Sequence, residues 1–121
     1  MGQIAELQRH IHADATEKGW WQSDLLPLRR QTPRGFLEVL MLIVSEVSEA
    51  AEEYRNGRAY TETWYSEAKP DKPEGIPSEM ADVVIRVLDA CEYYGIDLEQ
   101  AIKEKMAYNR TRPHRHGGKL A

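Results

Sequence analysis

Apolar residues recur at intervals of three and four through the middle of the chain, and this spacing constrains the fold more than any other feature. Thr32 and Pro33 suit the start of a helix there, as a capping residue and a first helical position, and Gly57 suits its end. Between them runs the apolar stripe of an amphipathic helix, made of Phe36, Leu37, Leu40, Met41, Val44, Val47, Ala51 and Tyr54. We expect this stripe to be core.

Three further segments have helical spacing, and no run of strict alternation is long enough to predict a strand. The last of them has Asp97 as a cap, with Gln100 placed to complete a capping box, and should fade near Thr111 ahead of Pro113. The sequence therefore predicts an all-α fold, a four-helix bundle. The three segments cover about residues 3–18, 77–94 and 98–111.

The length of 121 residues is typical of one domain with one core, so we treat residues 1–121 as a single unit. Residues 58–76 are polar and contain prolines, which predicts a long loop with a short helical turn near 61–65. The end of the chain, about 112–121, is predicted to be an irregular basic tail. Short connections elsewhere suit a helical bundle.

Composition excludes several classes of protein. The lone Cys91 rules out an intramolecular disulfide and leaves too few thiolates for a zinc cluster. No segment approaches the ~20 apolar residues that cross a bilayer, and we expect a cytoplasmic protein without a membrane partner. The net charge of −4 argues against specific binding of nucleic acid, although residues 103–121 carry six basic side chains and one acidic one.

Two pairs of carboxylates stand out on the predicted helices. Glu46 and Glu49 are three residues apart on the central helix, and Glu79 and Asp82 repeat that spacing at the start of the next helix. Residues at this spacing share one helix face. If the two helices pack antiparallel, the four carboxylates converge, and cations are needed to offset their repulsion.

A single pair of this kind is usually a solvated helix face, whereas two pairs are a stronger signal. Alanines beside the acids, at positions 50, 51 and 81, permit close approach of the helices. Carboxylate oxygens select hard cations. We therefore expect Mg²⁺, with Mn²⁺ as a substitute, and phosphate groups of a substrate to complete the coordination shell.

These motifs resemble those of the MazG-like, all-α nucleoside triphosphate pyrophosphohydrolases. Two features differ from the family pattern: Ser45 stands where a second acid often precedes Glu46, and the gap between the paired motifs is long. The similar segments lie between about residues 36 and 119, with Lys18–Trp21 in addition, and are SEVSEA (45–50), EYR (53–55), EMADVVIR (79–86), KMAYNRTR (105–112) and RHGGK (115–119).

The resemblance implies that Glu46, Glu49, Glu79 and Asp82 bind magnesium. It also implies that the enzyme converts a ribo- or deoxynucleoside triphosphate and water to the monophosphate and pyrophosphate, in housecleaning or regulation of the nucleotide pool. Glu46 or Glu49 is then the base that deprotonates a water attacking the α-phosphorus. A homodimer or homotetramer is the expected assembly.

Further residues are expected to bind the substrate. Three polar side chains follow one another at intervals of four and three residues near the end of the last helix: Lys105, Asn109 and Arg112. They offer hydrogen-bond donors to phosphate or sugar. Trp20 or Trp21 is placed to stack on a nucleobase, and we expect at least one of them to pack in the core.

Two alternatives belong to other functional classes. A di-iron carboxylate bundle also gathers glutamates from facing helices, but it uses Glu-x-x-His pairs, and neither acidic pair here has a histidine at the third position. A non-catalytic helical interaction module is the other alternative, and absence of triphosphate hydrolysis in a folded protein would favour it. The two histidines of the first helix, His10 and His12, are expected to be exposed polar residues.

Overall fold

The structure, a computed structural model, describes residues 2–21 and 33–112, and the predicted cap Thr32 and most of the predicted basic tail lie outside these ranges. The prediction of an all-α fold is confirmed, because the described residues form helices and no strand. None of these helices is long and apolar enough to cross a membrane. The helices are α1 (Gln3–Glu17), α3 (Pro33–Arg55), α4 (Ile76–Tyr93) and α5 (Leu98–Thr111).

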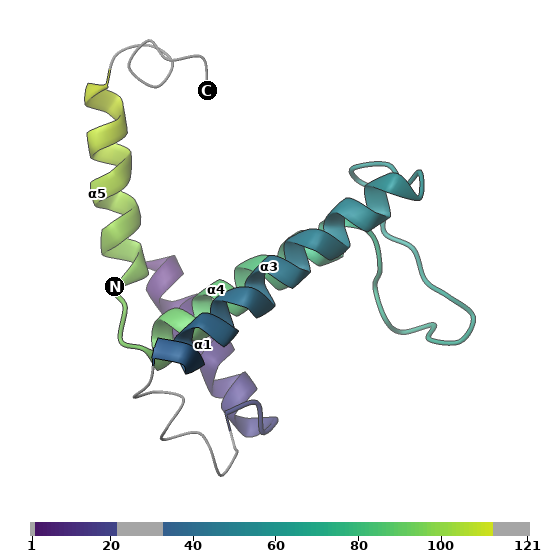
Figure 1. The fold of residues 1–121 in the computed structure, drawn as a ribbon, viewed down its shortest axis with the longest axis horizontal. Helices are drawn as coiled ribbons and strands as arrows, with labels where there is room; N and C mark the ends of the chain where they lie inside the picture. Colours follow the sequence, from purple (N-terminus) through teal and green to yellow (C-terminus); the bar gives the residue numbers. More distant parts are fainter. Residues whose placement is uncertain (1, 22–32, 113–121) are drawn as a thin grey trace.

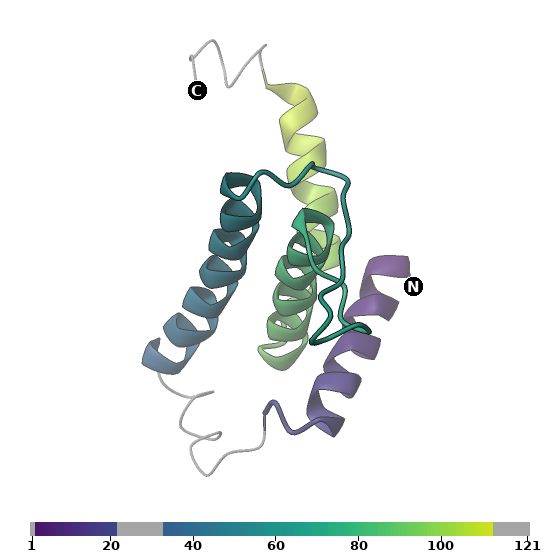
Figure 2. The same ribbon diagram turned by 90° about the vertical axis from the view of Figure 1, so that its right-hand side faces the viewer.

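Helix α4 lies at the centre, with α3 packed on one side and α1 on the other (Figures 1 and 2). Helix α5 contacts α1 and projects beyond the other three helices (Figure 2). The long loop between α3 and α4 extends from the opposite end of the molecule (Figure 1). A site built from α3 and α4 is therefore framed by α1 and by this loop.

The core is small and lies where α1, α4 and the first turns of α3 meet. Trp21, Val39 and Ala90 are buried there. The Trp21 ring stacks on Tyr93, with 3.8 Å between ring centroids, and Tyr94 meets the edge of Trp21. Aromatic packing of this kind adds to the hydrophobic stabilisation that comes from burial.

The expectation that the apolar stripe of α3 is core is wrong for the chain by itself. Leu37, Met41, Val44, Val47 and Tyr54 are each more than half exposed. The reason is geometric: α3 packs against its neighbours through the opposite face, which buries positions 35, 39 and 46. Within residues 2–21 and 33–112, the outer face of α3 is therefore an exposed apolar surface, while its inner face holds Glu46.

Helix α5 is tied to the rest of the structure at its first turn. The Glu99 carboxylate accepts hydrogen bonds from the backbone N–H groups of Gly2, at 3.3 Å, and Ala5, at 3.2 Å, and so caps the start of α1. The N–H of Ala5 is the main reason why the pKa of Glu99 lies below its usual range, with Lys103 adding to the effect. The contact joins the starts of two helices.

The predicted cap of α5 is confirmed, because the Asp97 side chain accepts from the backbone N–H of Gln100 at 3.1 Å. The reciprocal half of the predicted capping box is not formed. The side-chain amide of Gln100 donates instead to Glu104 at 3.1 Å, one turn further along the helix. The helix ends at Thr111, as the sequence predicts.

The loop before α4 is closed by backbone pairing and not by the predicted helical turn. Trp64 and Glu74 exchange two backbone hydrogen bonds of 2.9 Å each. The indole N–H of Trp64 donates to Glu53 on α3 at 3.1 Å, and the Arg58 guanidinium lies 4.0 Å from its ring centroid. Gly75 then enters α4 with φ of 118°, a conformation that favours glycine.

Candidate metal centre and adjoining cavity

One face of α4 carries a row of charged side chains. Glu79, Asp82, Arg86 and Asp89 follow one another at intervals of three, four and three residues. These intervals keep the side chains on one side of the helix. The row lies along the region where α4 meets α3 and α1.

Glu46 of α3 joins the first two members of this row. One carboxylate oxygen from each of Glu46, Glu79 and Asp82 lies within 4.8 Å of the other two. Glu46 is buried, at 7% exposure, because it lies on the face of α3 that packs against α4. Glu49 is exposed but is hydrogen-bonded to Glu79. The four carboxylates singled out from the sequence are therefore neighbours in the fold.

The crowding of these acids changes their pKa values. Burial, followed by the hydrogen bond and charge of Glu49, raises the pKa of Glu79 to about 7. Glu79 therefore keeps its proton to a higher pH than an ordinary glutamate does. Burial and then the charge of Glu46 raise the pKa of Asp82, against the opposing charges of Arg86 and Lys72.

The cluster suits a hard divalent cation. Its donors are carboxylate oxygens only, and among the described residues no histidine or cysteine joins them. The Oε2 atom of Glu79 is buried and has no hydrogen-bond partner in the described part of the chain. A cation such as Mg²⁺ or Mn²⁺ would satisfy this oxygen and replace the proton of Glu79.

Arg86 is a member of the site that the sequence argument did not single out as a site residue. Its Nε donates to Oε1 of Glu46 at 2.7 Å, and its guanidinium lies 4.5 Å from the centroid of the Trp20 ring. The signal was available, since Arg86 follows Asp82 by four residues and so shares its face. The arginine joins the acidic cluster to an aromatic side chain.

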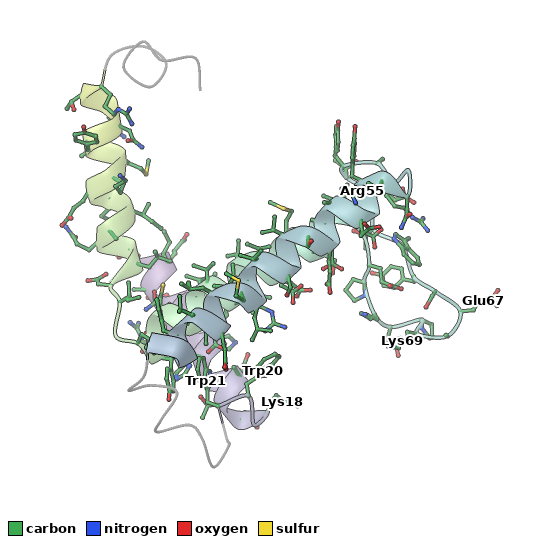
Figure 3. All side chains as sticks on the ribbon, viewed as in Figure 1. Lys18, Trp20, Trp21, Arg55, Glu67 and Lys69 are labelled. Atoms are coloured by element: carbon green, nitrogen blue, oxygen red, sulfur yellow. The ribbon has the colours of Figure 1, made fainter. Side chains whose placement is uncertain are left out.

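A cavity of about 350 Å³ adjoins the cluster and lies between α1 and α4. Glu46 and Asp82 line it on the side of the acidic cluster, and Asp89 lines it further along α4. Helix α1 contributes Ile11 and Ala15. Figure 3 shows Lys18 and Trp20, which also line the cavity, beside the end of α1.

The two adjacent tryptophans have different surroundings, and the expectation that at least one is core is confirmed. Trp21 is 8% exposed and stacks on Tyr93. Trp20 is 53% exposed and lines the cavity, with Arg86 over its ring. Of the two rings, Trp20 is the one available to a ligand.

Asp89 is held in place by two side chains. It accepts from the indole N–H of Trp21, at 2.9 Å to Oδ1 and 3.1 Å to Oδ2, and its Oδ1 lies 2.7 Å from Nδ1 of His12. The expectation that His12 is an exposed polar residue is wrong, because this position of α1 faces α4 and its side chain is 23% exposed. His10 is exposed, as expected.

The structure does not bring the basic residues of α5 to the acidic cluster. Lys105, Asn109 and Arg112 are exposed, and the cations of Lys105 and Arg112 each lie 5.9 Å from the ring centroid of Tyr108. Helix α5 projects away from the α3–α4 pair in both views (Figures 1 and 2). In one chain these residues and the carboxylates form separate groups.

No family model, curated protein or solved structure matches this chain. Its function is therefore inferred from the acidic cluster, the cavity and the pattern of charges described above.

Proposed function

We propose that this protein is a magnesium-dependent nucleoside triphosphate pyrophosphohydrolase of the MazG-like type. The observation that carries the proposal is the convergence of Glu46, Glu79 and Asp82 beside a cavity. Glu46 and Asp82 line this cavity, and so does the exposed Trp20. A cluster of acids suits a magnesium-bound polyphosphate, and an aromatic ring suits a nucleobase. The acidic cluster and the tryptophan adjoin the same cavity, so one nucleotide could place its phosphates at the acids and its base at the ring.

In the proposed reaction the carboxylates would hold magnesium, which would screen the phosphate oxygens and increase the acidity of water. Glu46 and Glu49 remain the candidates for the base that takes a proton from the attacking water. Oε1 of Glu46 is already engaged by Arg86 at 2.7 Å, whereas Glu49 is exposed and next to Glu79. We therefore favour Glu49. Attack at the α-phosphorus expels pyrophosphate and leaves the monophosphate.

The proposed base site is the exposed face of Trp20. Stacking on an aromatic ring contributes ~1–3 kcal/mol per base and does not by itself select one base. The guanidinium of Arg86 lies over the Trp20 ring and close to Glu46, so it is placed between base and phosphates. Such a position allows Arg86 to exchange Glu46 for a phosphate oxygen when the metal binds.

We propose that the active form is a homo-oligomer, a dimer or a tetramer. The outer face of α3 exposes an apolar stripe, and large exposed patches of this kind mark interaction surfaces. Lys105, Asn109 and Arg112 can contribute to phosphate binding only if a second copy brings α5 to the acidic cluster. An oligomer would thus account both for the exposed apolar stripe of α3 and for the distance between the basic residues of α5 and the acidic cluster.

A hydrolysis screen tests the proposed activity. Ribo- and deoxynucleoside triphosphates are incubated with magnesium, and the products are separated by ion-exchange chromatography. We expect monophosphate and pyrophosphate from at least one substrate. Diphosphate and orthophosphate as the main products would refute the mechanism, and a folded protein that hydrolyses no triphosphate would favour the non-catalytic interaction module.

A further inference from the structure

The cavity beside the acidic cluster has a fixed acceptor at the end away from the carboxylates. Asp82 and Asp89 lie on the same face of α4, seven residues apart, which corresponds to about 10 Å along the helix axis. Both line the cavity. This distance is on the scale of a nucleoside measured from its α-phosphate to the far edge of its base.

The Asp89 carboxylate is held rigidly. Trp21 Nε1 donates to both of its oxygens, at 2.9 and 3.1 Å, and His12 Nδ1 lies 2.7 Å from Oδ1. The Asp89 side chain is only 13% exposed, and Trp21 itself is buried against Tyr93. An acceptor fixed in this way cannot turn aside to accommodate a poorly matched ligand.

Its remaining capacity for hydrogen bonds can be counted. A carboxylate offers about four lone-pair sites over its two oxygens. Among the residues that the structure describes, Oδ1 is used by His12 and Trp21, and Oδ2 is used by Trp21 alone. Oδ2 therefore retains an unused lone pair, and a ligand group that meets it must be a hydrogen-bond donor.

We propose that Asp89 is a specificity-determining residue that selects nucleotides whose base carries an exocyclic amino group in place of a carbonyl. This inference rests on the proposed function only in taking the ligand to be a nucleotide. The exocyclic amino group of cytosine and adenine is a hydrogen-bond donor, whereas the carbonyl that uracil and thymine present is an acceptor. A carbonyl opposite Asp89 would set lone pair against lone pair, at a side chain that is only 13% exposed.

Binding of isosteric pairs of nucleotides tests the proposal without depending on hydrolysis. The full chain with magnesium is titrated with the 5′-monophosphates of deoxycytidine and deoxyuridine, and separately with those of deoxyadenosine and deoxyinosine, by calorimetry. Within each pair an amino group is replaced by a carbonyl. We expect the amino member of at least one pair to bind about tenfold more tightly or better, and no pair to favour the carbonyl member.

The variant Asp89→Asn keeps nearly the same shape but replaces an acceptor oxygen by an amide NH₂, which can donate a hydrogen bond to a carbonyl. We expect the preference to shrink at least tenfold, while Asp71→Asn, which removes an exposed acid in the loop between α3 and α4, leaves it unchanged. If Asp89→Asn does not fold, the comparison within pairs on the parent protein decides alone.

Equal binding within both pairs, a preference for the carbonyl member, or no binding of any nucleotide would overturn the inference. Hydrolysis without discrimination between the bases would refute the role of Asp89 and leave the proposed function standing. Discrimination in binding without hydrolysis of the triphosphates would support Asp89 and refute the proposed activity.

Discussion

Arg86 and Glu46 form an ion pair between α4 and α3, with 2.7 Å from Nε to Oε1, at the edge of the acidic cluster. Their side chains are 25% and 9% exposed, so the pair is largely shielded from water. Without metal, the guanidinium is the nearest compensation for the charge of Glu46. The positively charged guanidinium of Arg86 thus lies beside a site that is suited to a metal cation.

Replacing Arg86 by Ala should destabilise the metal-free protein by about 2 kcal/mol, because Glu46 would be left buried and unpaired. Magnesium should restore most of this loss by taking over the compensation of charge. Melting temperatures with and without magnesium measure both effects. As a control, Arg55→Ala removes a pair that is exposed on both sides, and it should change the free energy of unfolding by less than about 0.5 kcal/mol. Equal losses for the two variants would contradict this view.

Glu79→Gln and Asp82→Asn should each lower magnesium-dependent hydrolysis by roughly 100-fold or more, since each removes a charged ligand while keeping the shape. Metal-free stability should not fall, because neutralising one acid relieves repulsion in the cluster. Initial rates and metal-free melting temperatures are measured together. Glu67→Gln, in the exposed loop, is the matched control (Figure 3). Variants that melt earlier but keep full activity would show that the acids are structural.

The pH dependence of stability should carry the signature of Glu79. Its pKa is about 7 in the folded state against an ordinary 4.5, so the folded protein binds more protons between these values. Stability should therefore fall as pH rises from about 4.5 to 7, by roughly 2 kcal/mol once partial exposure is allowed for. Denaturant titrations without metal measure the slope. Glu79→Gln should flatten it, and a slope that is unchanged in this variant would assign the effect to other groups.

Gly75→Ala should destabilise the protein by about 3 kcal/mol. Gly75 has φ of 118°, and a Cβ there would overlap the backbone carbonyl oxygen of Glu62, so both the conformation and the space exclude a side chain. Gly57 also has a positive φ, of 86°, but nothing lies within 4 Å of its would-be Cβ. Gly57→Ala should accordingly cost only about 1 kcal/mol. Urea unfolding of both variants makes the comparison, and a reversed order would contradict the loop geometry.

Val44→Lys should weaken the proposed assembly, because it places a charge in the middle of the exposed stripe of α3. Light scattering should give the parent a mass of two or four chains, each of 13.9 kDa, and should give the variant a smaller mass. Thr61→Lys, in the loop after α3, adds the same charge elsewhere and should leave the mass unchanged. A monomeric parent would refute the oligomer.

The sequence predicted the helices well because their limits depend on local signals. Gly57 and Asp97 mark a stop and a start regardless of what packs nearby. The closeness of Glu46 and Glu79 was also predictable. Each belongs to a pair of acids on one face of its helix, and antiparallel packing of the two helices suffices to bring the pairs together. Both inferences need only helical geometry.

Other features depend on tertiary contacts that periodicity does not encode. The pattern of α3 identifies an apolar stripe, but it does not say whether the same chain or a second copy covers it. The pairing of Arg86 with Glu46 and the anchoring of His12 on Asp89 depend on how the helices are rotated about their axes. The direction of α5 depends on the short link through Gly95, which has no periodic pattern.

The attachment of α5 through Glu99 has a mechanical consequence. The helix has 14 residues, or about 21 Å, and its described contacts lie mainly at its first turn against α1. A rotation of about 10° at that pivot would carry Arg112 through roughly 4 Å, whereas residues near Glu99 would hardly move. The helix is a lever with its fulcrum at the start of α1, so the reach of its basic end can be altered without repacking the core.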